Sequence, residues 1–350
     1  MRNEEASADP AGADPVDTDA VGTVGEAGVL RRILARLSDA TAARLGPGDD
    51  CAVLGFAGDA VVTSDTMIEG PDFRLAWHSG FELGWKLAAT NLSDVAAMGA
   101  RPTALTVSLA CPAETPVGLL EEIARGLDEA CRELAPGCGV VGGDLGRAPA
   151  LIAAVTAMGD LEGRRPVQRS GAGIGDSVAY AGDLGLAGLG LSLLFGEAAE
   201  PDGTAHSRTL DGLRARHPAA LRAQLAPRPP VGLGVLAAEA GATAMLDVSD
   251  GLSIDAARLA RASGATVDLD AGLLAGGFGS QGSERIALDA MLFGGEDHGL
   301  LAAFPPGARL PDGFVAVGSI RQRGEADLTL GGEALTPRGW DPFTVRPPGS

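Results

Sequence analysis

The sequence predicts an α/β fold organised in two domains. Short apolar runs that suit β-strands alternate with longer segments whose apolar residues recur at helical spacing. A length of 350 residues fits one large or two medium domains. The composition turns polar between residues 160 and 166, which marks a domain boundary. We therefore expect a disordered acidic tail at 1–24, an N-terminal domain at 25–162 and a C-terminal α/β domain at 163–346.

The composition is that of a globular chain, and it excludes several classes of function. Hydrophobic residues make up 45% of the chain and charged residues 21%. The net charge of −19 argues against nucleic acid or an anionic membrane as a partner. Neither a signal peptide nor a membrane-spanning apolar stretch is visible, and the four cysteines lack C-x-x-C spacing, so we expect a reduced, cytoplasmic protein. Lys86 is the only lysine, which excludes a P-loop.

Helices and strands alternate in the first half of the chain. The helix over 80–98 places its apolar residues on about a third of its circumference, whereas Thr90 and Asp94 lie on the opposite side. The run Val140–Val141 predicts a buried strand that ends in a Gly142–Gly143 turn followed by Asp144. The other predicted elements are helices from Glu26 to Leu37 and over 116–134, and strands at Val61–Asp65, Thr103–Cys111 and Leu151–Met158.

The second half repeats this alternation, with polar turns at the ends of its strands. Ala244–Val248 predicts a strand, and the helix that follows, to about Ala262, is expected to be capped by Ser249 or Asp250. The run Gly294–Asp297 places two carboxylates behind a double glycine. The other predicted elements are strands at Ser177–Ala181 and Val315–Ile320, and helices over 185–196 and 231–240.

Carboxylates recur in turns at the predicted ends of strands and helices, and no lysine accompanies any of them. The stretch Gly46–Leu54 carries the adjacent carboxylates of Asp49 and Asp50, which repel each other unless a cation lies near. Taken alone, this stretch reads as a solvated turn. Hard cations such as Mg²⁺ take oxygen ligands, and two or more of them support phosphoryl transfer. Because such aspartates recur at six places, the alternative that each one only forms a separate turn or helix cap is disfavoured. The candidate ligands are Asp50, Asp65, Asp94, Asp144, Asp247 and Asp250, with Glu296 of a similar kind.

Seven segments of the chain, in order, resemble the motifs of thiamine-monophosphate kinases. The segments Asn91–Ala100 and Asp247–Leu252 are specific because they occur together with G-D-D and G-G-E-D turns. The likeness covers nearly everything after residue 25. The other segments are Gly48–Leu54, Thr63–Thr66 with Glu69–Gly70, Gly142–Asp144, Arg169–Ala172 and Gly294–Asp297.

The resemblance implies a two-domain fold of the aminoimidazole ribonucleotide synthetase type. Its N-terminal sheets would pair across a homodimer, and the active site would lie in the cleft between the domains. It also implies ATP-dependent phosphorylation of thiamine monophosphate to thiamine diphosphate, by direct in-line transfer assisted by several Mg²⁺ ions. No covalent intermediate is expected, because the sequence has no motif for an activated serine or cysteine.

The resemblance also assigns roles to single residues. Trp340 would either stack on the thiazolium cation of the substrate or dock the C-terminal segment. Asp49 would orient the loop that carries Asp50. The metal ligands would be Asp50, Thr63, Ser64, Asp65, Asp94, Asp144, Asp247 and Asp250, among which Asp94, Asp144 and Asp250 would be catalytic. The ATP contacts would be Gly143, Asp144, Arg169 and Ser249, and the thiamine contacts would be Asp72, Glu296 and Trp340.

Four places depart from the family's usual pattern. Asp72 stands where members often carry histidine near the substrate, and an aspartate there suits a cationic ring but repels a phosphate. The other departures are Leu145–Ala148, Asp183–Leu189 and His298–Leu300. Three alternatives remain open at this point: a sibling ATP-using ligase or synthetase, a non-catalytic sensor of Mg-nucleotide, and a structural protein that binds divalent cations.

Overall fold

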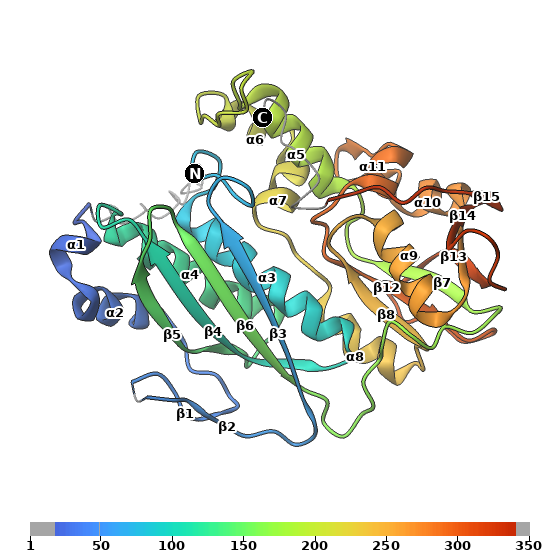
Figure 1. The fold of residues 1–350 in the computed structure, drawn as a ribbon, viewed down its shortest axis with the longest axis horizontal. Coiled ribbons are helices and arrows are strands. Elements are labelled where there is room, and N and C mark those ends of the chain that lie inside the picture. Colours follow the sequence, from blue (N-terminus) through green and yellow to red (C-terminus); the bar gives the residue numbers. More distant parts are fainter. Residues whose placement is uncertain (1–17, 49, 341–350) are drawn as a thin grey trace, which may run out of the picture.

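The computed structural model describes residues 18–48 and 50–340, and two large sheets organise them (Figure 1). Asp49, the predicted acidic tail up to residue 17 and the predicted domain's last residues, 341–346, lie outside the described residues. The elements around the first sheet are α1 (Val21–Val24), α2 (Glu26–Leu34), β1 (Ala43–Leu45), β2 (Val53–Leu54), β3 (Ala60–Ile68), α3 (Gly80–Ala97), β4 (Arg101–Cys111), α4 (Val117–Leu134), β5 (Gly139–Arg147) and β6 (Ile152–Asp160).

The second sheet is built from the rest of the chain and its helices. It starts at Ser177, whereas the first sheet ends at Asp160, and the domain boundary after residue 162 stays a prediction. The elements are β7 (Ser177–Ala181), α5 (Leu186–Glu197), α6 (Leu210–Arg216), α7 (Pro218–Leu225), α8 (Val231–Glu239), β8 (Ala244–Val248), α9 (Leu252–Ser263), β9 (Thr266–Leu269), α10 (Ala271–Phe278), β10 (Ser280–Gln281), β11 (Glu284–Arg285), α11 (Leu288–Phe293), β12 (Gly299–Phe304), β13 (Val315–Arg321), β14 (Leu328–Leu330) and β15 (Glu333–Ala334). The predicted α/β class is confirmed. None of the helices in the described ranges is long and apolar enough to cross a membrane.

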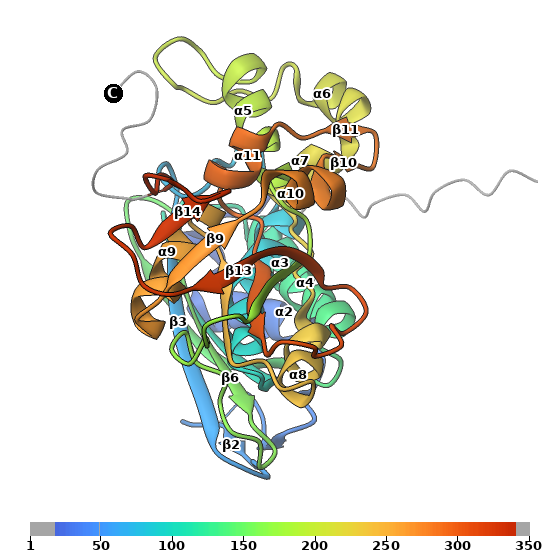
Figure 2. The ribbon, with the colours of Figure 1, turned by 90° about the vertical axis from the view of Figure 1, so that its right-hand side faces the viewer.

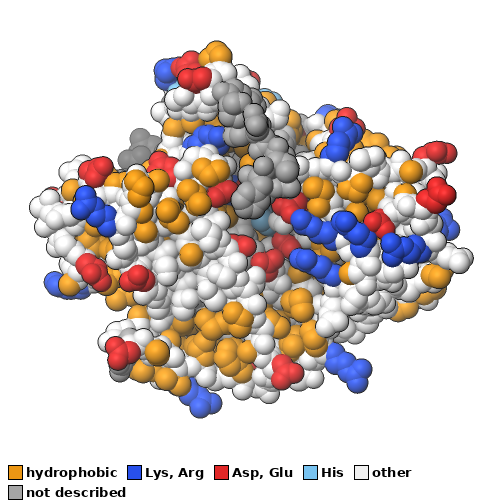
Figure 3. Space-filling view, viewed as in Figure 1, with side chains coloured by type: hydrophobic (Ala, Val, Ile, Leu, Met, Phe, Trp, Pro, Cys, Tyr) orange, Lys and Arg blue, Asp and Glu red, His pale blue; other side chains and the backbone are white. Residues whose placement is uncertain are grey.

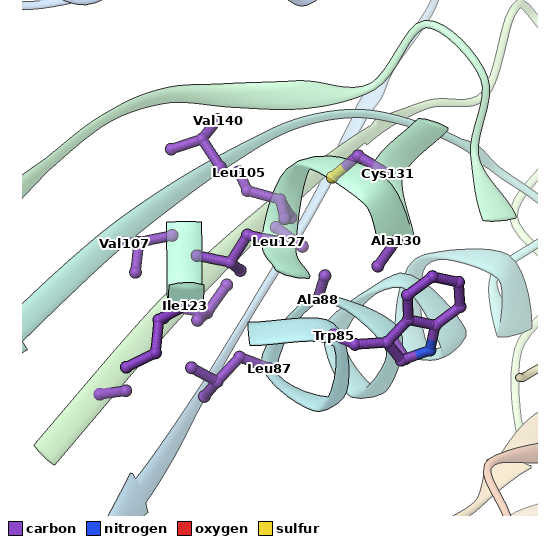
Figure 4. Packing of buried hydrophobic residues seen from close by; sticks show 14 of the residues in the cluster. Trp85, Leu87, Ala88, Leu105, Val107, Ile123, Leu127, Ala130, Cys131 and Val140 are labelled. Carbon is purple, nitrogen blue, oxygen red and sulfur yellow. The ribbon is translucent and has the colours of Figure 1, made fainter. Parts of the chain in front are cut away.

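The first sheet has four strands in the order β3-β6-β4-β5, and helices α3 and α4 cover one of its faces. Strand β3 alternates between more and less buried residues along its whole length, which is the period of a strand with one covered face. In the core on that side, Leu105 and Val107 of β4 pack with Leu87 of α3 and with Ile123 and Leu127 of α4 (Figure 4).

The other face of the first sheet is open except at one end. There the β1–β2 hairpin covers it, and Ala104 and Val141 are buried beneath the hairpin. On this face of the edge strand β3, Val62 is 66% exposed and Ile68 is 39% exposed. Figure 3 shows hydrophobic side chains gathered over the lower part of this sheet. A monomer rarely leaves so much apolar surface on one face, so this face suits contact with another protein chain.

The second sheet has seven strands in the order β15-β14-β9-β13-β7-β12-β8, and helices cover both of its faces. One face packs against α5, α9, α10 and α11, and the other packs against α8 and the end of α3. Helices α5, α6 and α7 lie together above this sheet in both ribbon views (Figure 1 and Figure 2). All described strand pairs in the sheet are antiparallel except β14 with β9.

Helix α3 lies between the two sheets and is buried on nearly every side. It begins with a capping box, in which Ser79 and Glu82 satisfy each other's backbone N–H groups. The predicted apolar face is present, and the polar side opposite it is covered as well. Thr90 and Ser93 are 3% and 0% exposed because α8 and β8 pack on that side. The helix therefore has two packed faces, one for each sheet.

Glycines let the helices approach α3 closely. A Cβ on Gly84 of α3 would overlap the backbone oxygen of Ile123 in α4, and a Cβ on Gly126 of α4 would overlap that of Phe81. On the other side, a Cβ on Gly234 of α8 would overlap the backbone oxygen of Ala96. The backbones on both sides of α3 therefore pack at distances that only glycine permits.

The Gly142–Gly143 pair lies inside strand β5, and the predicted turn at this place is wrong. Strand β5 continues past the glycines to Arg147, in parallel pairing with β4. A Cβ on Gly143 would overlap the backbone oxygen of Val107 in β4. The glycine is therefore required by close packing within the sheet and not by a reversal of the chain.

Candidate active site

Three carboxylates from three elements lie close together where the two sheets meet. Asp65 is on β3, Asp94 on α3 and Asp247 on β8. Thr63 lies two residues before Asp65 on the same face of β3, and its Oγ1 donates to Asp94 Oδ2 at 3.0 Å. Asp247 is only 5% exposed and accepts from Ser93 Oγ at 3.3 Å. Both parts of the chain thus contribute to one acidic cluster.

This cluster is electrostatically unfavourable without a cation. Burial, together with the charges of Asp247 and Asp65, raises the pKa of Asp94 to about 8. Burial also raises the pKa of Asp65, in spite of the opposing effect of His298, and the charges of Asp247 and Asp250 raise it further. Carboxyl groups held so close ionise together only when positive charge neutralises them.

Asp250 pairs with an arginine that sequence analysis did not identify. Nη1 of Arg258 lies 2.6 Å from Asp250 Oδ2 and 2.8 Å from Asp255 Oδ1. Asp255 is 2% exposed, and burial together with the nearby carboxylate of Asp247 raises its pKa to about 7. Arg258 therefore neutralises the outer end of the acidic cluster.

The predicted cap of α9 is wrong. The residue before the helix is Gly251, at φ 116°, and neither Ser249 nor Asp250 makes a side-chain capping bond. A positive φ of this kind is accessible mainly to glycine, so Gly251 sets the path of the chain here. The Asp250 side chain is consequently free to turn away from the helix terminus and toward Arg258.

His298, one of the departures from the family pattern, lies beside Asp247. Its Nδ1 is 3.6 Å from Asp247 Oδ2, and its backbone N–H donates to Val248 O. Burial alone would lower the pKa of His298, but the Asp247 carboxylate outweighs burial and the pKa is raised. A protonated His298 would add one positive charge to the acidic cluster.

Glu296 is held by the only lysine of the chain. Nζ of Lys86 lies 2.7 Å from Glu296 Oε1, and Nε2 of Gln224 donates to Glu296 Oε2. Burial would raise the pKa of Glu296, but Lys86 and Gln224 together lower it. No lysine lies next to a candidate carboxylate in the sequence, but the expectation that none accompanies them is wrong, because Lys86 contacts Glu296 in the folded chain.

Asp72 lies near this ion pair, at the end of β3. Its Oδ2 accepts from the backbone N–H of Ile68 at 2.8 Å. Burial and the charge of Glu296 raise its pKa, although the Ile68 N–H and Lys86 oppose the shift. Asp72 and Glu296 thus share one neighbourhood, and their contact with a substrate stays a prediction.

Arg74 is a second cation near Glu296 that the sequence did not single out. Its Cζ lies 4.8 Å from the ring centre of Trp77 and 4.7 Å from that of Phe195. Burial lowers the pKa of Arg74, and Glu296 opposes the shift. No carboxylate in the described ranges lies within ion-pair distance of its guanidinium. The only signal in the sequence is the short spacing of Arg74 and Trp77.

His78 makes the protein sensitive to acid. Burial and the nearby Lys86 lower its pKa to about 4, whereas the unfolded chain keeps a pKa near 6.5. Between these values the unfolded state binds more protons, so stability is lost as pH falls from 6.5 toward 4. We expect protonation of this residue in the unfolded chain to lower the free energy of unfolding by about 2 kcal/mol at pH 4.5 relative to pH 7. Denaturant titrations at both pH values should therefore show a smaller acid loss for His78→Gln than for the wild type, and equal losses would contradict the assignment.

Asp297 has a structural role in the Gly294–Asp297 turn. Its carboxylate accepts from the backbone N–H groups of Gly185 at 2.5 Å and Ala187 at 2.9 Å, at the N-terminus of α5. Burial raises its pKa to about 7 in spite of these bonds. Its neighbour Glu296 has φ 68°, which is a left-handed backbone conformation. The bonds from Asp297 to the N-terminus of α5 hold this turn in place.

Three of the predicted ligands are not brought to the acidic cluster. Asp144 is exposed on β5 and pairs in register with Ser108 of β4, on the open face of the first sheet. Ser64 points to that same face, where it bonds to Thr156 and to the backbone of β6. Asp50 is exposed in the β1–β2 hairpin, which covers one end of this face. Their roles as metal ligands stay predictions.

The residues predicted to contact ATP and thiamine lie at several places around the cluster. Ser249 follows Asp247 in the β8–α9 turn, and its backbone oxygen accepts from Glu296 N–H at 2.7 Å. Arg169 is exposed, and its backbone oxygen accepts from Ser263. Gly143 lies in the interior of β5. The backbone N–H of Trp340 donates to Asp250 O, which fits a docked C-terminal segment.

The chemistry of the acidic cluster fits a hard divalent cation. Its donors are carboxylate and hydroxyl oxygens, and the raised pKa of Asp94 marks a site that gains stability from positive charge. In the described ranges, however, no three acidic, histidine or cysteine side chains are already gathered closely enough to hold a metal ion. A cation there would draw the carboxylates of the two parts together.

Comparisons with known proteins agree with the fold. Residues 48–161 match the family model described as AIR synthase related protein, N-terminal domain. A thiamine-monophosphate kinase of Mycobacterium tuberculosis is 38% identical over 328 residues, which are 91% of this chain and 92% of the relative. The crystal structure of a thiamine-monophosphate kinase from Stenotrophomonas maltophilia is 31% identical, with a TM-score of 0.71, over 88% of this chain and 96% of that chain. The structure of AaThiL complexed with AMPPCP and TMP is 27% identical, with a TM-score of 0.67, over 91% of this chain and 96% of that chain.

Proposed function

The chain belongs to the thiamine-monophosphate kinase family, and we propose that it transfers the γ-phosphoryl group of ATP to the phosphate of thiamine monophosphate. The products would be ADP and thiamine diphosphate. The related AaThiL was complexed with AMPPCP and TMP, which supports this pair of substrates. The observation that carries the proposal is the acidic cluster of Asp65, Asp94 and Asp247, because it joins the two parts of the chain at one point.

The acidic cluster would hold Mg²⁺. We propose Asp65, Asp94, Asp247 and Asp250 as its carboxylate ligands, with Thr63 as a neutral donor that orients Asp94. When bound, Mg²⁺ would neutralise the phosphate oxygens of ATP and of the acceptor. Asp250 is free for this role only if it leaves Arg258, so Arg258 would be released toward the bound phosphates.

The transfer itself would be direct and in line. A terminal oxygen of the acceptor phosphate attacks the γ-phosphorus, a new P–O–P linkage forms and the bond to the leaving ADP breaks. The acceptor oxygen needs no general base, because a phosphate monoester is already anionic near pH 7. The chain's contribution would be to position the two phosphates and to exclude water, which is a large share of the catalysis in such reactions.

The organic end of the acceptor would lie toward Glu296 and Asp72. Lys86 already neutralises Glu296, so Asp72 would supply the carboxylate that meets a thiazolium cation in this neighbourhood. Arg74 would meet an electron-rich atom of the substrate, since it lacks a carboxylate partner among the described residues. The distance along α3 from Lys86 to Asp94 is eight residues, or about 12 Å. That length suits a substrate whose cationic ring and phosphate lie at opposite ends.

The assay that tests the function follows both products. The protein is incubated with ATP, Mg²⁺ and thiamine monophosphate, and ADP and thiamine diphosphate are quantified by chromatography. We expect equal amounts of the two products, none with unphosphorylated thiamine, and none after chelation of the metal. Conversion of a different phosphorylated acceptor, with thiamine monophosphate untouched, would instead indicate a sibling enzyme. Binding of Mg-AMPPCP without any turnover would indicate a nucleotide sensor.

We further propose that the open face of the first sheet pairs two copies of the chain. The face exposes Val62 and Ile68, and among residues 18–48 and 50–340 only the β1–β2 hairpin covers its strands. We expect Val62→Arg to shift the protein from dimer to monomer, because the charge would be buried without a partner at the interface. Light scattering coupled to gel filtration measures this shift. Ile174→Arg is the matched control, because Ile174 is 69% exposed in the loop before β7. A wild-type monomer, or a Val62→Arg dimer, would contradict the pairing.

A further inference from the structure

A lysine in the middle of α3 links the two parts of the chain through a buried ion pair. The Lys86 side chain is 0% exposed, and its Nζ contacts only atoms from the second part in the bonds the structure describes: Glu296 Oε1 at 2.7 Å and Gln224 O at 3.1 Å. Lysine is almost never fully buried unless it is paired, since removing an ammonium group from water is costly. A chain that contains one lysine and buries it entirely therefore uses its charge for a specific contact.

The ion pair continues to the acidic cluster through the backbone. Glu296 adopts φ 68°, and its N–H donates to Ser249 O at 2.7 Å. Ser249 stands between Asp247 and Asp250, so the Glu296 turn packs directly on the turn that carries these two carboxylates. A displacement of Glu296 would consequently displace Asp247 and Asp250.

Helix α3 presents both ends of this arrangement. Lys86 meets Glu296 at one place, and Asp94, about 12 Å farther along the helix, meets Asp247 at the other. The helix is rigid and buried, so two contact points along it fix the turn of the second part in both position and rotation. The acidic cluster alone cannot do so, because its like charges repel one another.

We propose that Lys86 is a positioning residue: its ion pair with Glu296 holds the Asp247–Asp250 turn at the correct place relative to Asp94. Lys86 does not touch the reacting atoms, and it acts through Glu296. The inference rests on the proposed kinase function, because it assigns the geometry of that same site. A misplacement of about 1 Å at a reacting centre costs on the order of 100-fold in rate.

The test compares Lys86→Met with a matched control on the same helix. Trp85 also bridges the two parts, since its Nε1 donates to Pro227 O at 2.6 Å, but it has no contact with Glu296. We expect Lys86→Met to lower kcat about 100-fold, with a much smaller change in the KM for ATP. Trp85→Phe should lower the melting temperature and keep kcat within about threefold of the wild type. Equal losses of kcat in the two variants would mean that Lys86 is only structural.

Two further variants separate positioning from loss of fold. Lys86→Met/Glu296→Gln removes both charges, so it should regain melting temperature relative to Lys86→Met but not kcat. Lys86→Arg keeps the charge and should keep at least about a tenth of the wild-type kcat. Full recovery of kcat in the double variant would overturn the proposal, and so would a Lys86→Met enzyme with normal kcat.

The same experiment distinguishes this proposal from the proposed function. If the wild type makes no thiamine diphosphate, the function fails, and the variants are then compared by calorimetric titration with Mg²⁺ and AMPPCP. In that case Lys86→Met should weaken binding of the nucleotide at least about tenfold, because Asp247 and Asp250 are misplaced, whereas Trp85→Phe should not. If the wild type turns over and Lys86→Met matches it, the function stands and the positioning role fails.

Discussion

Asp94→Asn is expected to lower the turnover of the proposed kinase reaction about 1,000-fold, on the scale of losing one preorganised group that stabilises the transition state. The substitution keeps the shape of the side chain and its bond from Thr63, but it removes the negative charge that Mg²⁺ would meet. Steady-state assays of thiamine diphosphate formation at saturating Mg²⁺ measure the loss. A turnover within tenfold of the wild type would show that Asp94 is not a metal ligand.

The same variant should be more stable than the wild type when divalent cations are absent. Burial and the charges of Asp247 and Asp65 raise the pKa of Asp94 to about 8, so the folded state is penalised increasingly as pH rises from about 4 to 8. We expect a melting temperature a few degrees higher for Asp94→Asn at pH 8 in chelator, at about 2–4 °C per kcal/mol. Asp312→Asn is the control, because the Asp312 side chain is 99% exposed in the loop between β12 and β13. A less stable Asp94→Asn protein in chelator would contradict the repulsion.

Gly234→Ala is expected to destabilise the protein by about 3 kcal/mol or more and to impair catalysis. A Cβ at this position would overlap the backbone oxygen of Ala96, which is two residues from Asp94 on α3. Helix α8 must then move away from α3, and overpacking of this kind costs several kcal/mol when the neighbour is backbone. Thermal or denaturant unfolding, together with the turnover assay, measures both effects.

The control for this substitution lies on the same helix. Gly232 is two residues before Gly234, and a Cβ there would meet nothing within 4 Å. Gly232→Ala should therefore stabilise the protein slightly, by about 0.5–1 kcal/mol, because alanine is the better helix former. If both alanine variants behaved alike, the close approach of α8 to α3 would not be a constraint.

Local pattern was enough to predict many of the elements, and distant packing explains where the prediction at Gly142–Gly143 went wrong. The strands at Ser177–Ala181 and Ala244–Val248 follow from apolar runs bounded by glycine and polar residues. Thr90 lies opposite the apolar face of α3 as predicted, but periodicity reports one covered face and could not show that a second sheet covers Thr90 and Ser93. The turn expected at Gly142–Gly143 is wrong because glycine serves equally for a reversal and for the close approach of two strands.

The candidate site was predictable in composition but not in geometry. Asp65, Asp94 and Asp247 could be identified from their motifs, and the structure brings them together. Asp144 and Asp65 lie on opposite faces of one sheet, and this depends on strand register, which no motif encodes. The partner of Lys86 could not be predicted either, because Glu296 lies more than 200 residues farther along the chain.

Helix α3 makes the two parts of the chain inseparable. A fragment that ended at the predicted boundary after residue 162 would keep the first sheet but would uncover the side of α3 on which Lys86, Thr90 and Ser93 lie. It would present an unpaired ammonium group beside apolar surface, and such a fragment would associate with other chains or be degraded. The complementary fragment would lack the end of α3, which covers one face of the second sheet together with α8. Gene fusions, split reporters and truncated expression vectors should therefore leave the connection between the two sheets intact.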